Sequence, residues 1–137
     1  MTLETLSILI YGLLIFGAVA VQATYAALTA GLAFGFSNRE GVQPGMGAVG
    51  RRIEMTLANL KEGAIMYVPL ALLAVSLGVS NEWTSGAALL TIVSRLVYIP
   101  VFYLGIPVAR TLVWVPSFFA IPALAIGILV GVPGTLP

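Results

Sequence analysis

Four long stretches of this chain carry so few charges that each one is suited to cross a lipid bilayer as a helix. They lie at about residues 5–36, 53–79, 84–105 and 111–132, and a transmembrane helix needs about 20 mainly apolar residues. Only 8% of all residues are charged, against about 25% in a typical soluble domain. The sequence therefore predicts an all-α membrane protein in which residues 1–137 form a single four-transmembrane-helix domain.

The connections between these stretches predict how the helices run. The second and third connections are only a few residues long, and short links join antiparallel neighbours, so we expect an up-down-up-down bundle. Cytoplasmic connections carry an excess of Lys and Arg. We therefore expect both termini to lie outside, because the basic residues fall in the first and third connections (Arg39, Arg51, Arg52 and Arg110) and the acidic Glu4 and Glu82 fall on the other side.

Two glycine pairs have the spacing that lets membrane helices approach closely. They are Gly31-x-x-x-Gly35 and Gly127-x-x-x-Gly131. Small residues four apart allow backbones to come together, but they are also common in membrane helices that make no such contact. Either pair is a candidate for a close helix contact.

The residue types that are missing exclude several functions. The chain has no Cys and no His, so it has no thiol nucleophile of its own and lacks the usual ligands of haem and zinc. We expect neither a metal nor haem. No basic cluster exceeds the Arg51-Arg52 pair, so we expect no nucleic-acid partner. Any chemistry must use Arg, Glu, Tyr, Ser or Thr, or a reactive group that the substrate brings.

Two charged residues nevertheless lie inside the apolar stretches. Glu62 is in the second and Arg95 is near the middle of the third. A charge at the bilayer centre costs at least about 2.5–3.5 kcal/mol, so such residues usually face protein, water or a ligand. Asn59 lies three residues before Glu62, and Tyr98 lies three residues after Arg95. At this spacing each of them shares a helix face with the neighbouring charge. We expect Glu62 to pair with Arg95 in a buried polar site, either directly or through a bridging water or ligand. The alternative is that this pair only holds the bundle together, although buried pairs are weak stabilisers.

The residues around these charges resemble a known family, the MAPEG family (membrane-associated proteins in eicosanoid and glutathione metabolism), and most closely its small bacterial branch. The resemblance covers about three quarters of the chain in order and spacing. It rests on three segments, which are Gly50-Arg51 followed by Leu57-Ala58-Asn59-Leu60-Lys61-Glu62-Gly63, then Arg95-Leu96-Val97-Tyr98-Ile99-Pro100 with Tyr103 and Gly105, and finally Arg110-Thr111-Leu112-Val113-Trp114.

The resemblance implies a homotrimer in which glutathione binds in a cleft between neighbouring protomers. The implied glutathione-binding residues are Asn59, Glu62, Arg95 and Tyr98, with Arg51 or Arg52 contributing from the turn above. An Arg at the position of Arg110 lies near the thiol in a leukotriene-forming member. A nearby guanidinium favours the thiolate, which is the nucleophile. Arg110 and Tyr103 are therefore the predicted catalytic residues, and lipophilic electrophiles would arrive from the surrounding membrane lipids.

Two positions depart from the glutathione enzymes that the chain resembles. Met55 stands where they carry an Arg, and Phe102 stands where they carry a second Tyr, with Tyr103 one residue later. The sequence thus leaves two functions open. One is a glutathione-dependent transferase or peroxidase that acts on lipophilic electrophiles. The other is a non-catalytic membrane scaffold or an accessory, lipid-binding subunit that kept the fold. A channel or transporter is less favoured, since few polar residues are present to line a path.

Overall fold

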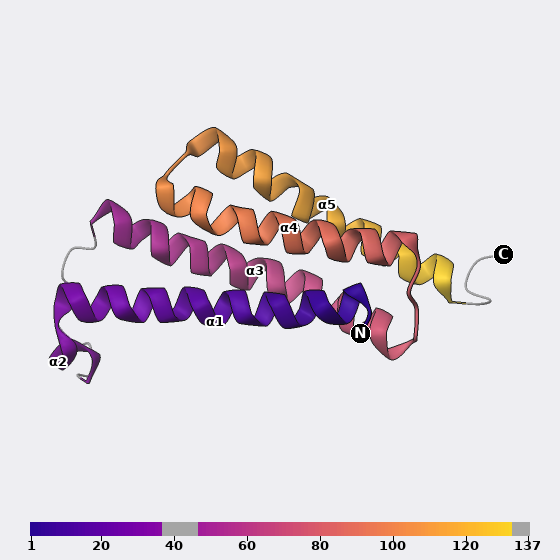
Figure 1. Ribbon diagram of the computed structural model, residues 1–137, viewed down its shortest axis with the longest axis horizontal. Helices are drawn as coiled ribbons and strands as arrows, with labels where there is room; N and C mark the ends of the chain where they lie inside the picture. Colours follow the sequence, from indigo (N-terminus) through magenta and orange to yellow (C-terminus); the bar gives the residue numbers. More distant parts are fainter. Residues whose placement is uncertain (37–46, 133–137) are drawn as a thin grey trace.

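Four long helices form the body of the protein, and a fifth is short. The computed structural model describes residues 1–36 and 47–132, and Figure 1 shows their course. No strand occurs in these two segments. The four long helices are each long and apolar enough to cross a membrane, which confirms the predicted fold class. In chain order the helices are α1 (Leu3–Ala30), α2 (Leu32–Gly35), α3 (Ala48–Ser76), α4 (Glu82–Leu104) and α5 (Pro107–Gly131).

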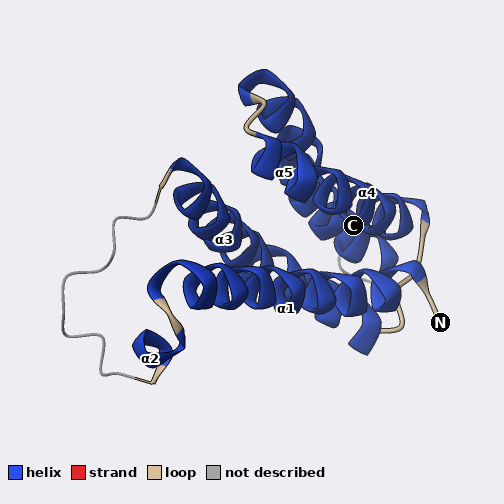
Figure 2. Ribbon diagram, turned by 60° about the vertical axis from the view of Figure 1, so that its left-hand side comes forward, coloured by secondary structure: helices blue, strands red, loops and turns tan. Residues whose placement is uncertain are grey.

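The long helices alternate in direction along the bundle (Figure 1). α1 packs against α3 and α4, and α5 packs mainly against α4, while α1 and α5 make no contact with each other. The start of α3, the end of α4 and the start of α5 lie together at one end, which we call the pocket end. The start of α1 and the α3–α4 turn lie at the other, which we call the Glu4 end. Figure 2 shows the α4–α5 pair diverging from α1 and α3 toward the pocket end.

Small side chains let the helices approach closely in the interior. Ala71 and Ala74 of α3, Ala88 of α4 and Ala120 of α5 are fully buried. Lipid tails are as apolar as a protein core, so membrane helices associate through close packing rather than through hydrophobic burial. A few larger apolar side chains complete this interior, among them Leu60 and Leu124.

The Gly127 pair makes the close contact that its spacing suggests, and it does so within the chain. A Cβ on Gly127 would lie 2.7 Å from Thr84 Cγ2 and 2.8 Å from Trp83 Cβ. A Cβ on Gly131 would meet Val79. The Asn81 side chain donates a hydrogen bond to the Gly127 carbonyl at 2.8 Å. These contacts hold α5 against the turn that begins α4.

The first predicted span, residues 5–36, is too long in one respect. α1 ends at Ala30, and Gly31 adopts a φ of 82°, a left-handed backbone that favours glycine. The chain then turns into the four-residue α2. Gly31 thus breaks the helix. A Cβ at this position would meet no other atom within 4 Å. Arg39 and most of the first connection, which we predict as a loop over residues 37–50, lie outside the described residues, but residues 48–50 already belong to α3.

Candidate functional site

Arg95 lies in the interior of the bundle and is only 4% exposed. Its Nη1 atom donates a hydrogen bond to Asn59 Oδ1 on α3 at 2.8 Å. The central carbon of its guanidinium lies 5.7 Å from the centroid of the Tyr11 ring and 5.8 Å from that of Tyr98. Rings at this distance attract a cation through their negative faces. Three helices thus meet around one buried positive charge.

Gly63 makes room for this arrangement. A Cβ on Gly63 would overlap with both the Tyr11 hydroxyl and the Arg95 guanidinium. The backbone of α3 therefore lies directly against these two side chains, and any larger residue would have to displace them. The Leu57–Gly63 segment thus contributes both the amide that binds Arg95 and the space that admits it.

The predicted ion pair between Glu62 and Arg95 is wrong. Glu62 is exposed, and within the described segments Arg95 pairs with Asn59 and with no carboxylate. The reason is helix geometry. Three residues correspond to 300° of rotation at 3.6 residues per turn, so Glu62 is turned about 60° from Asn59 around α3. Asn59 faces α4 and contacts Arg95, whereas Glu62 lies on the side of α3 that lines the adjacent pocket and makes no ion pair with Arg95.

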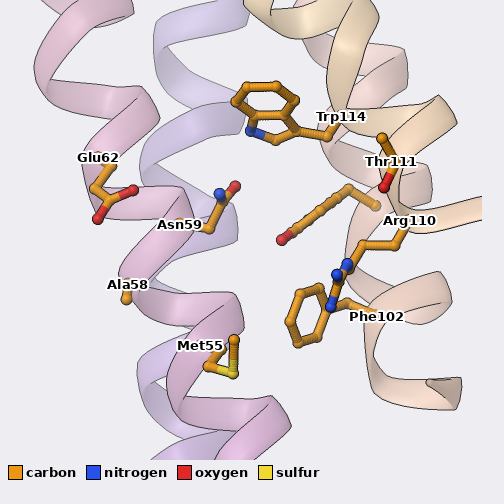
Figure 3. A pocket seen from close by; sticks show the side chains of 9 residues that line it. Met55, Ala58, Asn59, Glu62, Phe102, Arg110, Thr111 and Trp114 are labelled. Atoms are coloured by element: carbon orange, nitrogen blue, oxygen red, sulfur yellow. The ribbon is translucent and has the colours of Figure 1, made fainter. Parts of the chain in front are cut away.

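A pocket of about 340 Å³ opens beside Asn59 at the pocket end. Sites for small molecules range from about 300 to 1,000 Å³, so this one is at the small end of that range. Figure 3 shows its side chains projecting from α3 on one side and from α4 and α5 on the other. The lining residues are Met55, Ala58, Asn59, Glu62, Tyr98, Phe102, Arg110, Thr111 and Trp114.

The pocket combines polar groups of both charges with an apolar wall. Glu62 supplies a carboxylate and Arg110 a guanidinium, and both side chains are exposed. The Arg110 guanidinium lies 5.1 Å from the centroid of the Phe102 ring (Figure 3). Met55 and Trp114 are among the apolar residues. Such a surface suits a ligand with charged ends and an apolar part. In the described part of the chain, no cluster of acidic side chains could hold a metal ion.

Of the other predicted site residues, Arg52 has a different contact from the one expected. Its Nη1 donates to the carbonyl of Tyr103 at 3.4 Å, in the last turn of α4. Its guanidinium also lies against Gly105, where a Cβ would overlap with it. Gly105 has a left-handed φ of 74° and ends α4. Arg52 therefore neutralises the negative end of the α4 dipole and ties α3 to the corner between α4 and α5.

Arg51 and Tyr103 are not among the residues that line the pocket. Arg51 is exposed at the start of α3. The Tyr103 hydroxyl is buried and makes no hydrogen bond with the described residues. The structure thus brings Asn59, Glu62, Tyr98 and Arg110 together at one pocket, holds Arg95 directly behind Asn59, and leaves Arg51, Arg52 and Tyr103 outside it.

Sequence reasoning missed the part that α1 plays. Its buried residues include Glu4, Ser7 and Tyr11, at spacings of three and four that define one helix face. This stripe of polar residues in an apolar stretch was the available signal. Thr111 and Trp114 of the pocket wall are likewise three positions apart. They entered the sequence analysis only as part of the family resemblance.

Comparison with known proteins gives one match. The sequence model of the MAPEG family matches residues 2–130, which include α1, α3, α4 and all of α5 but its last residue. Neither curated proteins nor solved structures give a significant match.

Proposed function

Because the chain belongs to the MAPEG family, we propose that its pocket binds glutathione and directs the thiolate at lipophilic electrophiles. The observation that carries this proposal is that four polar side chains, Asn59, Glu62, Tyr98 and Arg110, line one pocket in a chain with few polar residues. Intramembrane polar groups are costly, and those that remain usually mark a functional site. The protein itself has no Cys, so the sulfur comes from the co-substrate.

The charges of the pocket complement those of glutathione. The Glu62 carboxylate accepts hydrogen bonds from the ammonium group of glutathione, and Asn59 binds an amide or a carboxylate of glutathione. Arg110 lies beside the sulfur and stabilises the thiolate, as nearby cations do. Tyr98 donates a hydrogen bond. The apolar side chains Met55, Phe102 and Trp114 receive the electrophile from the lipid.

In the transfer reaction, the thiolate sulfur forms a bond to the electrophilic carbon, and the electron pair of the broken bond leaves with the departing group. In the related peroxidase reaction the sulfur attacks a peroxide oxygen, the O–O bond breaks, and the other oxygen leaves as an alcohol after it takes up a proton. A second glutathione then reduces the resulting sulfenic acid, which gives the disulfide and water. Both reactions require the thiolate. The pocket residues act on binding and on the ionisation of the sulfur.

Titration calorimetry with reduced glutathione tests this function. Wild-type protein in detergent is expected to bind glutathione, and Arg110→Gln is expected to transfer it to an activated aryl chloride far more slowly. Lys61→Gln is the matched control, because Lys61 is an exposed cation on α3 that does not line the pocket. An absence of glutathione binding by the wild type at millimolar concentration contradicts the proposal.

A non-catalytic, lipid-binding role is the second candidate, and one observation favours it. Met55 and Phe102 stand in the pocket where the glutathione enzymes of the resemblance carry Arg and Tyr, which makes much of the lining apolar. In that case the pocket receives a lipid, and the protein serves as a scaffold or accessory subunit. Co-purified phospholipid in native mass spectrometry, together with no heat of glutathione binding, would support this second role.

The same family supports a homotrimer as part of the proposal. Glu54, Lys61 and Glu62 are exposed on the membrane-spanning helix α3. Charged side chains in contact with lipid are costly, so neighbouring copies that cover this face lower that cost. Native mass spectrometry of the purified protein decides the matter, since a single monomer peak contradicts the trimer.

The orientation belongs to the proposal as well. Arg51, Arg52 and Arg110 lie at the pocket end, and Glu4 and Glu82 lie at the opposite end. By the positive-inside rule, the pocket end faces the cytoplasm of a bacterial inner membrane and the termini face the periplasm. Single cysteines are informative here because the chain has none of its own. Positions 51 and 82 must react with impermeant reagents from opposite sides.

A further inference from the structure

The Tyr11 side chain lies against the site although it does not line the pocket. It is only 2% exposed on α1, and its ring is stacked on that of Tyr67 at 5.9 Å between centroids with an interplanar angle of 21°. The Tyr67 hydroxyl shares a hydrogen bond of 2.7 Å with Ser7. These contacts fix the Tyr11 ring in one position relative to α3. The Arg95 guanidinium also lies over this ring, with its central carbon 5.7 Å from the ring centroid.

Arg95 has few other partners to fix its guanidinium. Its Nη1 is bound to Asn59, but Nε makes no hydrogen bond with any described residue, and no described carboxylate pairs with Arg95. A buried charge with so little hydrogen bonding is held mainly by the rings beside it, since cation–π attraction grows when water is excluded. One of these rings, Tyr98, belongs to the same helix as Arg95. Tyr11 is the one that comes from elsewhere in the chain.

We propose that Tyr11 is a positioning residue of the pocket. Its ring holds the Arg95 guanidinium against Asn59, and so keeps a positive charge directly behind the pocket wall. α1 thereby controls how strongly the pocket attracts an anionic ligand, without contacting that ligand. The effect on affinity rests on the proposed glutathione function, while the effect on Arg95 does not.

The hydroxyl of Tyr11 has no role in this arrangement. It is buried and makes no hydrogen bond with described residues, and it lies against Gly63. Replacing an unpaired buried hydroxyl by hydrogen removes no hydrogen bond and relieves its desolvation. The ring face therefore accounts for the function, and phenylalanine at this position is expected to replace tyrosine fully, whereas leucine is not.

The test follows the Nε–Hε signal of Arg95 by NMR in micelles, assigned by its loss in Arg95→Lys. In wild-type protein and in Tyr11→Phe, the ring currents are expected to shift this signal away from the signals of exposed arginines. Tyr11→Leu is expected to move it toward them. Tyr25→Leu is the matched control on the same helix, and is expected to leave the signal unchanged. If Tyr11→Leu fails to fold, Tyr11→Met, which is also without a ring, takes its place.

Calorimetry with reduced glutathione supplies the second readout. Tyr11→Leu is expected to weaken binding about tenfold, while Tyr11→Phe and Tyr25→Leu stay within about twofold of the wild type. An unchanged Arg95 signal in Tyr11→Leu overturns the positioning role. So does a loss of affinity in Tyr11→Phe equal to that in Tyr11→Leu. If wild-type protein binds no glutathione, the proposed function falls, and the NMR signal alone still decides whether Tyr11 positions Arg95.

Discussion

The two ends of this bundle treat their buried polar groups in opposite ways. At the Glu4 end, the Glu4 carboxylate is 1% exposed and accepts hydrogen bonds from Thr84 at 2.6 Å, and from Ser80 and Ser85 at 3.2 Å each. At the pocket end, Arg95 makes one side-chain hydrogen bond with the described residues, and its Nε has no partner among them. Within the described segments the carboxylate of the first cluster has several donors, whereas the guanidinium of the second lacks partners.

This difference separates a structural role from a functional one. Buried polar groups are nearly always hydrogen-bonded, and an exception calls for an explanation. The Glu4 cluster joins the start of α1 to the α3–α4 turn and the start of α4, so its groups are satisfied by the fold they stabilise. The groups around the pocket make fewer bonds with one another. They are the ones available to a ligand.

The largest expected effect is at the Glu4 end. Glu4→Ala removes the charged acceptor of the buried Thr84 hydroxyl and of the less buried Ser80 and Ser85 hydroxyls, and hydrogen bonds to charged groups contribute about 1.5–3 kcal/mol. We expect the free energy of unfolding in bicelles to fall by about 3 kcal/mol, with glutathione affinity unchanged in the folded fraction. Glu82→Ala, an exposed acidic residue in the first turn of α4, is the control and should change stability little. A stable Glu4→Ala protein that has lost its ligand would reverse the comparison.

Gly63→Ala tests the pocket end by steric overlap. The added methyl group collides with Tyr11 and Arg95, and overpacking costs about 1–3 kcal/mol. We expect a loss of about 2 kcal/mol in unfolding free energy together with weaker glutathione binding. Gly86→Ala is the control, because nothing lies within reach of a Cβ there. Equal behaviour of the two variants would show that the contacts around Gly63 are not tight.

Asn59→Asp makes the pocket end resemble the Glu4 end. The new carboxylate lies at the position from which Asn59 now accepts a bond from Arg95 at 2.8 Å, so it supplies the missing countercharge. We expect glutathione affinity to fall about tenfold, equivalent to about 1.4 kcal/mol, while the free energy of unfolding is maintained or rises. Calorimetry and unfolding measurements on the same sample give both quantities. A parallel loss of both would contradict the assignment of Arg95 to ligand attraction.

The smallest expected effect is that of Arg52. Arg52→Met removes a cation from the C-terminus of α4, where such interactions contribute about 0.3–1 kcal/mol. We expect a loss of stability near 1 kcal/mol, with glutathione affinity largely retained because Arg52 does not line the pocket. Arg51→Met, at an exposed neighbour, is the control and should stay within about 0.5 kcal/mol of the wild type. A large loss of affinity in Arg52→Met would restore its predicted role in binding.

Much of the fold was predictable because a helix that crosses a membrane needs about 20 mainly apolar residues. The four apolar stretches gave the four long helices and their alternation. The grouping of Asn59, Glu62, Tyr98 and Arg110 came from the family resemblance, and these four residues do line one pocket. The break at Gly31 was less accessible. The residues after it are as apolar as those before, and only the backbone angle of Gly31 ends the helix.

The partners of the charged residues were harder to predict for a physical reason. Spacing fixes which residues share a face of one helix, but it does not say which neighbouring helix that face meets. For this reason we predicted Glu62 as the partner of Arg95, whereas the partner in the structure is Asn59. The contact of Arg52 with the Tyr103 carbonyl was not predicted, because a backbone carbonyl at a helix end carries no sequence signal. Glu4 was counted as a charge at the membrane surface, although hydroxyls distant in sequence surround it.

The most direct test of the account is the pKa of the glutathione thiol when it is bound, followed by the ultraviolet absorbance of the thiolate. A cation beside the sulfur lowers a thiol pKa, so wild-type protein is expected to show thiolate at a pH where free glutathione is protonated. Arg110→Gln at the pocket end is expected to raise this pKa toward that of free glutathione, and Glu4→Gln at the opposite end is expected to leave it unchanged. A thiol pKa in wild-type protein equal to that of free glutathione would contradict the account.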